Sequence, residues 1–236
     1  MREAFDEARP ILMIFVISGI LIGGISWWLA GERPVEVSIE DESGELSEPL
    51  QVEALAEYDE DMSNNDNPVA VLETNQGVIE IELFENTMPI TSGNFAKLVD
   101  EGYYDGIKFH RVIEGFMIQG GDPITKTDEV LRYGTGGPGY AIQDEHVDGR
   151  ELTNVRGTIS MANSGPNSGG SQFFINLVDN TNLDFNKPPL SSKHPVFGKV
   201  VVGMDVVDAI GQVEVNPASS LPLEAVVIEK ATIRRS

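Results

Sequence analysis

The 236-residue chain contains no cysteine and few basic residues. The absence of cysteine excludes disulfide bonds and thiol catalysis, and it leaves the redox compartment open. The three histidines, His110, His146 and His194, have spacings that fit no metal-binding motif, so no metal ion or cofactor is expected. Lysine and arginine number 16 against 38 aspartate and glutamate residues. Because nucleic-acid binding needs clustered cations, nucleic acid is not an expected partner.

One long apolar run is present, PILMIFVISGILIGGISWWLA at residues 10–30, and it carries no charge. About 20 helical residues span about 30 Å, the hydrocarbon thickness of a bilayer. The run therefore predicts a transmembrane helix in contact with the lipid bilayer, with Trp27 and Trp28 at the interface. A cleaved signal peptide is the alternative, although Trp28 stands where a small residue normally precedes the cleavage site after Ala30.

The residues on either side of this run predict its orientation. Arg2 and Arg9 precede it and only Arg33 soon follows, so residues 1–9 are expected to be a short cytoplasmic segment. Residues 31–67 hold 13 acidic residues against one basic residue and few aromatics. Such a stretch cannot bury enough apolar surface to fold, which predicts an acidic flexible tether. The protein is thus expected in the cell membrane as a single-pass protein with its main domain on the extracytoplasmic side.

Residues 68–236 are expected to form one folded domain of short strands with two helices. Helices are predicted at residues 87–101, with Thr87 as N-cap, and at residues 204–210. Strands are predicted at residues 69–74, 78–84, 109–113, 116–119, 158–162, 172–175, 195–202 and 225–234. The predicted class is all-β with minor helix. Because a closed barrel has no exposed edge strand, a closed eight-stranded antiparallel β-barrel capped by two helices is the expected architecture.

Four sequence runs in this domain carry a specific resemblance. They are FHRVIEGFMIQGGD (109–122), GTGG (134–137), SMANSGPNSGGSQFFI (160–175) and HPVFGKV (194–200). In this order and at these spacings, they closely resemble the cyclophilins, the cyclosporin-binding peptidyl-prolyl cis-trans isomerases. The resemblance covers roughly residues 68–235 and implies an eight-stranded antiparallel barrel capped by two helices.

Matched residue by residue, the resemblance implies a proline-binding groove. Arg111, Gln119 and Phe174 correspond to catalytic positions. The remaining groove positions, which would bind the substrate peptide, are His110, Phe116, Met117, Ala162, Asn163, Gln172, Asn182, Leu183 and His194. Phe116, Met117, Phe174 and Leu183 would form the apolar floor under the proline ring, and the amide side chains would bind the peptide backbone.

The chemistry of prolyl isomerisation suits an arginine. Rotation about the X–Pro bond has a barrier of about 18–20 kcal/mol from amide resonance, and it takes tens of seconds or more uncatalysed. In the twisted bond the prolyl nitrogen gains a lone pair, to which the permanently charged guanidinium of Arg111 can donate. Non-covalent stabilisation of the twisted imide by Arg111 and a dry pocket would therefore catalyse the reaction without a cofactor.

Each of these residues also has an ordinary structural explanation. Phe116 and Phe174 could be core aromatics, and Gln119 and Asn163 could be strand-end or turn amides. His194 could be a surface histidine. At the level of function, the alternative is a non-catalytic peptide-binding module or holdase chaperone with the same groove, and a further one is a membrane scaffold whose tether binds partners.

Two features depart from the family pattern. Many cyclophilins carry an aromatic residue just before the leucine matched by Leu183, where this chain has Asn182. The loss of that aromatic is expected to weaken binding of cyclosporin-like cyclic peptides more than it weakens prolyl turnover. The loop at residues 123–133 is also longer than usual and is expected beside the groove, where it could alter substrate choice.

Overall fold

The computed structural model describes residues 67–147, 149, 152–187 and 193–235. The predicted membrane helix at residues 10–30 and nearly all of the predicted tether lie outside these ranges. Within the described ranges, no helix is both long and apolar enough to cross a bilayer.

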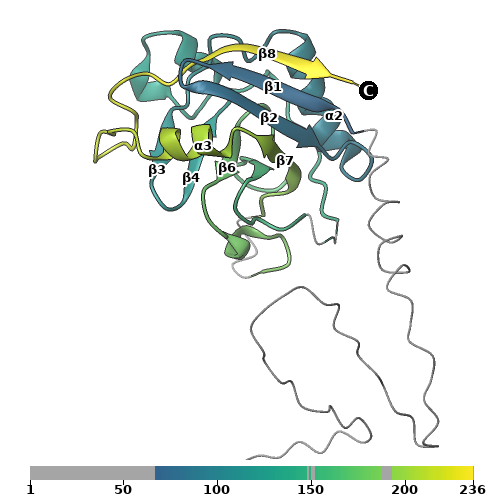
Figure 1. Ribbon diagram of the computed structural model, residues 1–236. Coiled ribbons are helices and arrows are strands. Elements are labelled where there is room, and N and C mark those ends of the chain that lie inside the picture. The colour runs from purple at the N-terminus through teal and green to yellow at the C-terminus, as the bar shows by residue number, and fades with distance from the viewer. Residues whose placement is uncertain (1–66, 148, 150–151, 188–192, 236) are drawn as a thin grey trace, which may run out of the picture. The chain divides into compact units, whose positions relative to one another are not determined.

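Eight strands form one antiparallel sheet (Figure 1), in the order β3-β4-β6-β5-β7-β2-β1-β8. The strands are β1 (Val69–Thr74), β2 (Gly77–Leu83), β3 (Arg111–Ile113), β4 (Met117–Gly120), β5 (Thr158–Met161), β6 (Phe173–Asn176), β7 (Val196–Val202) and β8 (Ile228–Arg234). Within the described part of the chain the helices are α2 (Pro89–Asp100) and α3 (Met204–Gly211). Short 3-10 helices also occur among the described residues, namely η1 (Pro123–Lys126), η2 (Val130–Arg132) and η4 (Thr181–Leu183). The predicted all-β class with two helices is therefore confirmed.

The expectation of a closed barrel is wrong, because the curled sheet is open. Strands β3 and β8 end the sheet and do not pair with each other. The segment before β3 meets the start of β8 instead: Lys108 and Val227 form an isolated bridge, and the Ile228 N–H donates to the Ile107 carbonyl at 2.8 Å. Strand β3 has three residues, and the Val112 N–H donates at 2.8 Å to the carbonyl of Ser220 in the loop before β8. That loop covers the edge of β3, which protects it without closure by β8.

The core lies on one face of the sheet, against α2. Phe95 of α2 packs its ring against the rings of Tyr104, Phe173 and Phe197, with centroids 4.8, 5.4 and 5.3 Å apart. Successive side chains of a strand point to opposite faces, so Phe173 enters the core while its neighbour Phe174 points to the other face. Met117 and Phe174 are buried but are not part of the central core cluster of described residues. The outer face of β4 and β6 therefore carries apolar side chains of its own.

Helix α2 begins later and is capped differently from the prediction. Its N-cap is Met88, and no N-cap side chain accepts a hydrogen bond, so the assignment of Thr87 as N-cap is wrong. The free N–H groups of Ile90 and Thr91 instead donate to the two carboxylate oxygens of Glu145, at 2.9 and 2.7 Å. A carboxylate at a helix N-terminus stabilises the unpaired N–H groups and the helix dipole. The cap comes from a distant loop, which no local capping rule could have identified.

We expect Glu145→Gln to lower the free energy of unfolding by about 1–2 kcal/mol, because one acceptor oxygen and the negative charge are lost at the helix end. Urea denaturation followed by circular dichroism measures this change. Glu73→Gln, at an exposed site in β1, is the matched control and should change stability by less than about 0.5 kcal/mol. Equal effects of the two substitutions would contradict the capping role of Glu145.

Candidate active site

The three predicted catalytic residues lie in one row across the sheet. Arg111 on β3 is paired with Gln119 on β4, and Gln119 is paired with Phe174 on β6. Residues directly opposite in an antiparallel pair share a face, so all three side chains belong to the outer face of the sheet. The sheet thus brings together residues that are up to 63 positions apart in the sequence.

A chain of hydrogen bonds runs along this row. The Arg111 Nη1 donates to Gln119 Oε1 at 3.3 Å, and Gln119 Nε2 donates to Gln172 Oε1 at 3.1 Å. Gln172 Nε2 in turn donates to the carbonyls of Gly134 and Gly136, at 3.0 and 2.8 Å. Arg111 is exposed, and most of its five N–H donors have no partner among the described residues. The guanidinium is therefore positioned by the hydrogen bond from Nη1, and its other N–H groups are available to a ligand.

Contacts on the outer face bring most of the predicted apolar floor together. The rings of Phe174 and His194 meet edge to face, with centroids 5.4 Å apart. The backbone N–H of His194 donates to the carbonyl of Leu183 at 3.2 Å. Met117 lies two residues before Gln119 on β4 and so shares its face. Phe116 is half-buried just before β4.

The remaining predicted residues lie at the borders of this row. The Ala162 N–H donates to the carbonyl of Gln172 at 3.0 Å, which sets Ala162 beside the amide row. Asn163 is half-buried, and its Nδ2 donates to the carbonyl of Lys193 at 2.6 Å, close to His194 in the sequence. Asn182 is exposed in η4 next to Leu183, so this border of the site is polar.

His110, the neighbour of Arg111 in the sequence, lines a hollow of about 320 Å³ together with Arg111. The hollow is lined by His110, Arg111, Gln119, Val130, Tyr133, Gly134, Ser219 and Leu221. The last five were not predicted as site residues, although the first two of them lie in the loop at residues 123–133 that was expected beside the groove. The prediction that this loop lies beside the groove residues is confirmed.

The environment of the two site histidines favours their neutral form. His110 is 6% exposed, and neither of its ring nitrogens has a hydrogen-bond partner among the described residues. Burial lowers the pKa of His110; the Asp122 carboxylate opposes this shift, and Arg111 adds to it. Burial likewise lowers the pKa of His194, against a smaller opposing effect of the Met161 carbonyl, which lies 3.1 Å from Nδ1. Both rings are thus suited to line a groove at neutral pH.

These shifts predict a pH dependence of stability. In the unfolded chain histidine titrates near about 6.5, so below that pH the unfolded state binds more protons than the folded state. The free energy of unfolding should therefore fall as the pH drops below about 6.5, by at most about 1.4 kcal/mol per pH unit for each histidine. Urea midpoints at pH 7.5 and 5.5 measure the fall, and His110→Gln should reduce it. An unchanged pH dependence in that variant would contradict the inferred neutral, buried state of His110.

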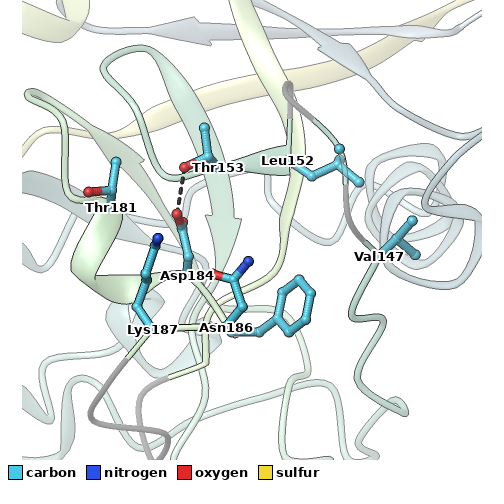
Figure 2. A pocket seen from close by; sticks show the side chains of 9 residues that line it. Val147, Leu152, Thr153, Thr181, Asp184, Asn186 and Lys187 are labelled. Carbon is cyan, nitrogen blue, oxygen red and sulfur yellow. Dashed lines mark hydrogen bonds between the residues drawn. The ribbon is translucent and has the colours of Figure 1, made fainter. Parts of the chain in front are cut away.

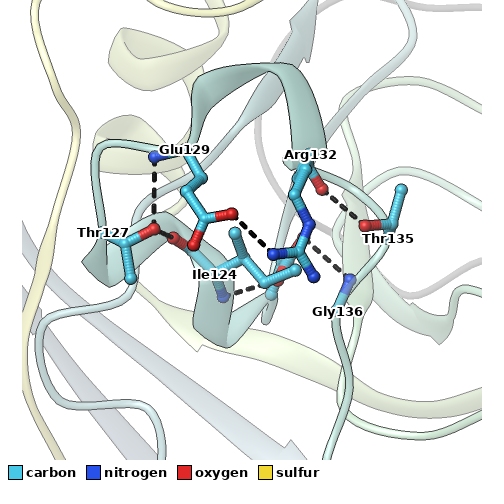
Figure 3. A network of polar contacts seen from close by, with 7 residues as sticks. Ile124, Thr127, Glu129, Arg132, Thr135 and Gly136 are labelled. Carbon is cyan, nitrogen blue, oxygen red and sulfur yellow. Dashed lines mark hydrogen bonds and ion pairs between the residues drawn. The ribbon is translucent and has the colours of Figure 1, made fainter.

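Asp122 organises the loop beside the site. Its side chain is fully buried, and its two oxygens accept from the backbone N–H groups of Ile124, Gly134 and Gly136 at 2.7, 2.5 and 3.2 Å. The loop adds contacts of its own (Figure 3): Arg132 pairs with Glu129 at 2.5 Å, and hydroxyls of the loop donate to backbone carbonyls. The loop is thus a structured part of the site, and its base also carries the carbonyls that accept from Gln172.

A hollow of about 310 Å³ lies elsewhere, near Asp184 (Figure 2), and contains none of the predicted site residues. Thr153 Oγ1 donates to Asp184 Oδ2 at 2.5 Å in its wall. Within the described ranges, no group of three histidine, aspartate or glutamate residues is arranged to hold a metal ion. The row on the outer face remains the best-formed candidate: a guanidinium beside an aromatic floor, with amides along it, has the character of a peptide-binding site.

Comparisons with known proteins agree with this class. The model of the family described as cyclophilin type peptidyl-prolyl cis-trans isomerase/CLD matches residues 69–233. The human protein named peptidyl-prolyl cis-trans isomerase-like 1 is 41% identical over 169 residues, which cover 70% of this chain and 91% of that protein. The chain therefore belongs to the cyclophilin-type peptidyl-prolyl cis-trans isomerase family.

Solved structures and longer relatives extend the comparison. A crystal structure of a cyclophilin-type isomerase from Cryptosporidium parvum is 31% identical, with a TM-score of 0.61, over 72% of this chain and 98% of that one. A Streptococcus pyogenes protein, whose name describes a bifunctional phosphatase/peptidyl-prolyl cis-trans isomerase, is 39% identical over 95% of this chain. This chain spans 52% of that relative, and 27% of a peptidyl-prolyl cis-trans isomerase-like 2 from Cryptococcus neoformans.

Proposed function

We propose that this chain catalyses cis–trans isomerisation of X–Pro bonds in polypeptides. The observation that carries the proposal is the position of Arg111, exposed and tied to Gln119 in the same sheet row as Phe174. The proline ring would lie on the floor around Phe174 and His194, which are in ring contact. The guanidinium would then donate to the nitrogen lone pair that appears as the bond twists.

In the expected mechanism, both the charge of Arg111 and the groove stabilise the twisted imide. A turnover in milliseconds needs a gain of about 10⁴, or roughly 5–6 kcal/mol. One charge-assisted hydrogen bond from Arg111 contributes about 1.5–3 kcal/mol of this. The rest would come from a dry floor that holds the ring and from amides, among them Gln172 and Asn163, that fix the peptide backbone while the acyl side rotates.

The substrates would be proline-containing polypeptides. One related structure, of the Cryptosporidium parvum isomerase, was determined in the presence of the dipeptide Ala-Pro. NMR exchange spectroscopy on an Ala-Pro peptide tests the proposal, because it reports the rate of cis–trans interconversion directly. Exchange at the uncatalysed rate, with binding retained, would instead identify a non-catalytic peptide-binding module or holdase chaperone.

Cyclosporin-like cyclic peptides are proposed as weak ligands. The expected aromatic wall is replaced by Asn182, which is exposed in η4. Titration calorimetry with cyclosporin measures the affinity of the natural chain and of Asn182→Trp. A gain in affinity is expected on substitution, and no gain would contradict the role given to this position.

We also propose that the isomerase domain is held at the cell membrane by residues 10–30, on the extracytoplasmic side. The proposal is supported by the uncharged 21-residue run and by the arginines that precede it. Proteins folding outside the cytoplasm and within reach of the acidic tether would then be its clients. Cleavage of the domain by protease added to intact cells is expected, and complete protection would overturn the orientation.

A further inference from the structure

The hollow beside Arg111 extends the groove in a direction that the proline floor does not use. We propose that this loop pocket, formed by His110, Arg111, Gln119, Val130, Tyr133, Gly134, Ser219 and Leu221, binds one bulky apolar side chain of the substrate polypeptide. The proposal rests on the proposed isomerase function and makes its substrate class more specific. Proline sites followed or preceded by a leucine-like residue would be preferred over those flanked by small or charged residues.

The pocket is continuous with the row of catalytic residues. Arg111 and Gln119 line it, and the same two side chains form the start of the hydrogen-bonded row that leads to Phe174. An extended chain advances about 3.3–3.6 Å per residue. A peptide whose proline lies on the floor around Phe174 therefore reaches the loop pocket within about two residues of that proline.

The walls of the pocket are preorganised on both sides. On one side, Tyr133 Oη donates to the Thr127 carbonyl at 2.7 Å, and Gly134 N–H donates to the buried Asp122. On the other side, Ser220 bonds to Val112 of β3 through its carbonyl, and its N–H donates to the Asn216 carbonyl at 2.8 Å. Because both walls are tied to the sheet or to its loops by backbone bonds, a side chain can bind without ordering them first.

The lining is largely polar, and Val130 and Leu221 are its two apolar side chains, on which the proposed contact depends. Val130 is 49% exposed and Leu221 is half-buried, so both present apolar surface that a ligand would cover. His110 is held neutral by burial, and Arg111 is the one charged side chain in the lining. A basic substrate residue would be repelled by Arg111, and an acidic one would pair with it and compete for the donors that the twisted bond needs. A volume of about 320 Å³ is at the low end for ligand pockets, which suits a single side chain.

The experiment uses an alanine-rich peptide with one proline and NMR exchange to measure kcat/KM. Single leucine substitutions are made at each of the two positions before and the two after the proline, with glutamate and lysine at the same positions for comparison. At one position, leucine should raise kcat/KM about tenfold over alanine, as apolar contact with Val130 and Leu221 allows. If no position prefers leucine, or if glutamate is preferred, the proposal is overturned.

Variants then assign the preference to the pocket. Val130→Ala and Leu221→Ala, each checked for folding by urea denaturation, should reduce the leucine-to-alanine ratio to about two or less. Val201→Ala, at a valine of β7 with similar exposure (46%) outside the pocket, should keep the ratio and the activity. Preference that survives in both pocket variants overturns the assignment. Turnover of the alanine-rich peptide without leucine distinguishes failure of the isomerase function from failure of the loop pocket. No turnover of this peptide refutes the proposed isomerase function. Turnover of all peptides without a preference for leucine refutes only the proposed role of the loop pocket.

Discussion

Replacing Arg111 with alanine is expected to lower kcat/KM for prolyl isomerisation by about 10²-fold and to leave the fold intact. A charge-assisted hydrogen bond made mainly in the transition state contributes about 1.5–3 kcal/mol, which corresponds to a factor of about 10–200. Arg111 is exposed and has one side-chain hydrogen bond among the described residues, to Gln119. Its loss should therefore change the free energy of unfolding by no more than about 0.5 kcal/mol.

Two further variants make the Arg111 result interpretable. Arg111→Lys keeps the charge but loses the planar fork of donors, so it should retain activity between that of alanine and arginine. Arg235→Ala removes another exposed arginine, which lies near the C-terminus and pairs with Asp100. This variant should leave kcat/KM unchanged. NMR exchange spectroscopy measures all three. An Arg111→Ala protein as active as Arg235→Ala would remove the basis of the proposed mechanism.

Local sequence patterns predicted the elements but not how they meet. The alternation of Ile79, Ile81 and Leu83 identified β2, and these three side chains are fully buried. Strict alternation would put Glu82 on the opposite, solvent-exposed face, yet Glu82 is buried and its Oε2 lies 3.1 Å from Lys199 Nζ on the neighbouring strand β7. The buried environment of Glu82 results from the pairing of β2 with β7, which lies more than a hundred residues further along the chain. A local periodicity cannot predict such a pairing.

The failed prediction of closure has the same origin. Counting eight strands and requiring protected edges led to a closed barrel. The edge of β3 is protected instead by the carbonyl of Ser220, in an irregular loop whose position depends on the turn around Asn216. The cap of α2 by Glu145, 55 residues beyond Ile90, is another long-range contact of this kind. Hydrogen-bond partners supplied by irregular loops are what the sequence could not reveal.

The residues of the candidate site could be predicted from the sequence better than the residues around it. Arg111, Gln119 and Phe174 were identified by the motif resemblance, and the sheet register places them in one row. Ser219 and Leu221 were missed because they lie about a hundred residues further along the chain, in a loop that carries no motif. The site thus has a part that the motifs specify and a part that only the packing of two loops defines.

Replacing Gly136 with alanine is expected to lower the free energy of unfolding strongly, because no space exists for a Cβ at this position. A Cβ there would overlap Asp122 Oδ1 and lie 2.9 Å from Ile124 Cγ1. Asp122 would have to move, and the part-buried N–H groups of Ile124 and Gly134 would lose their acceptor. An unsatisfied group costs about 1–3 kcal/mol when it is fully buried and less when it is partly exposed, so the free energy of unfolding should fall by about 1–3 kcal/mol.

The same substitution should also reduce activity, because the Gly136 carbonyl accepts from Nε2 of Gln172, a residue that is hydrogen-bonded to Gln119 in the candidate site. We expect kcat/KM to fall about tenfold at a temperature where the variant is still folded. Gly137→Ala is the matched control: a Cβ at Gly137 meets no atom within 4 Å, so stability and activity should stay close to those of the natural chain. Urea denaturation and NMR exchange on the pair test both effects. If Gly136→Ala matched Gly137→Ala in both, Asp122 would not be holding the loop base in place, and the link from that carboxylate through Gln172 to Arg111 would be absent.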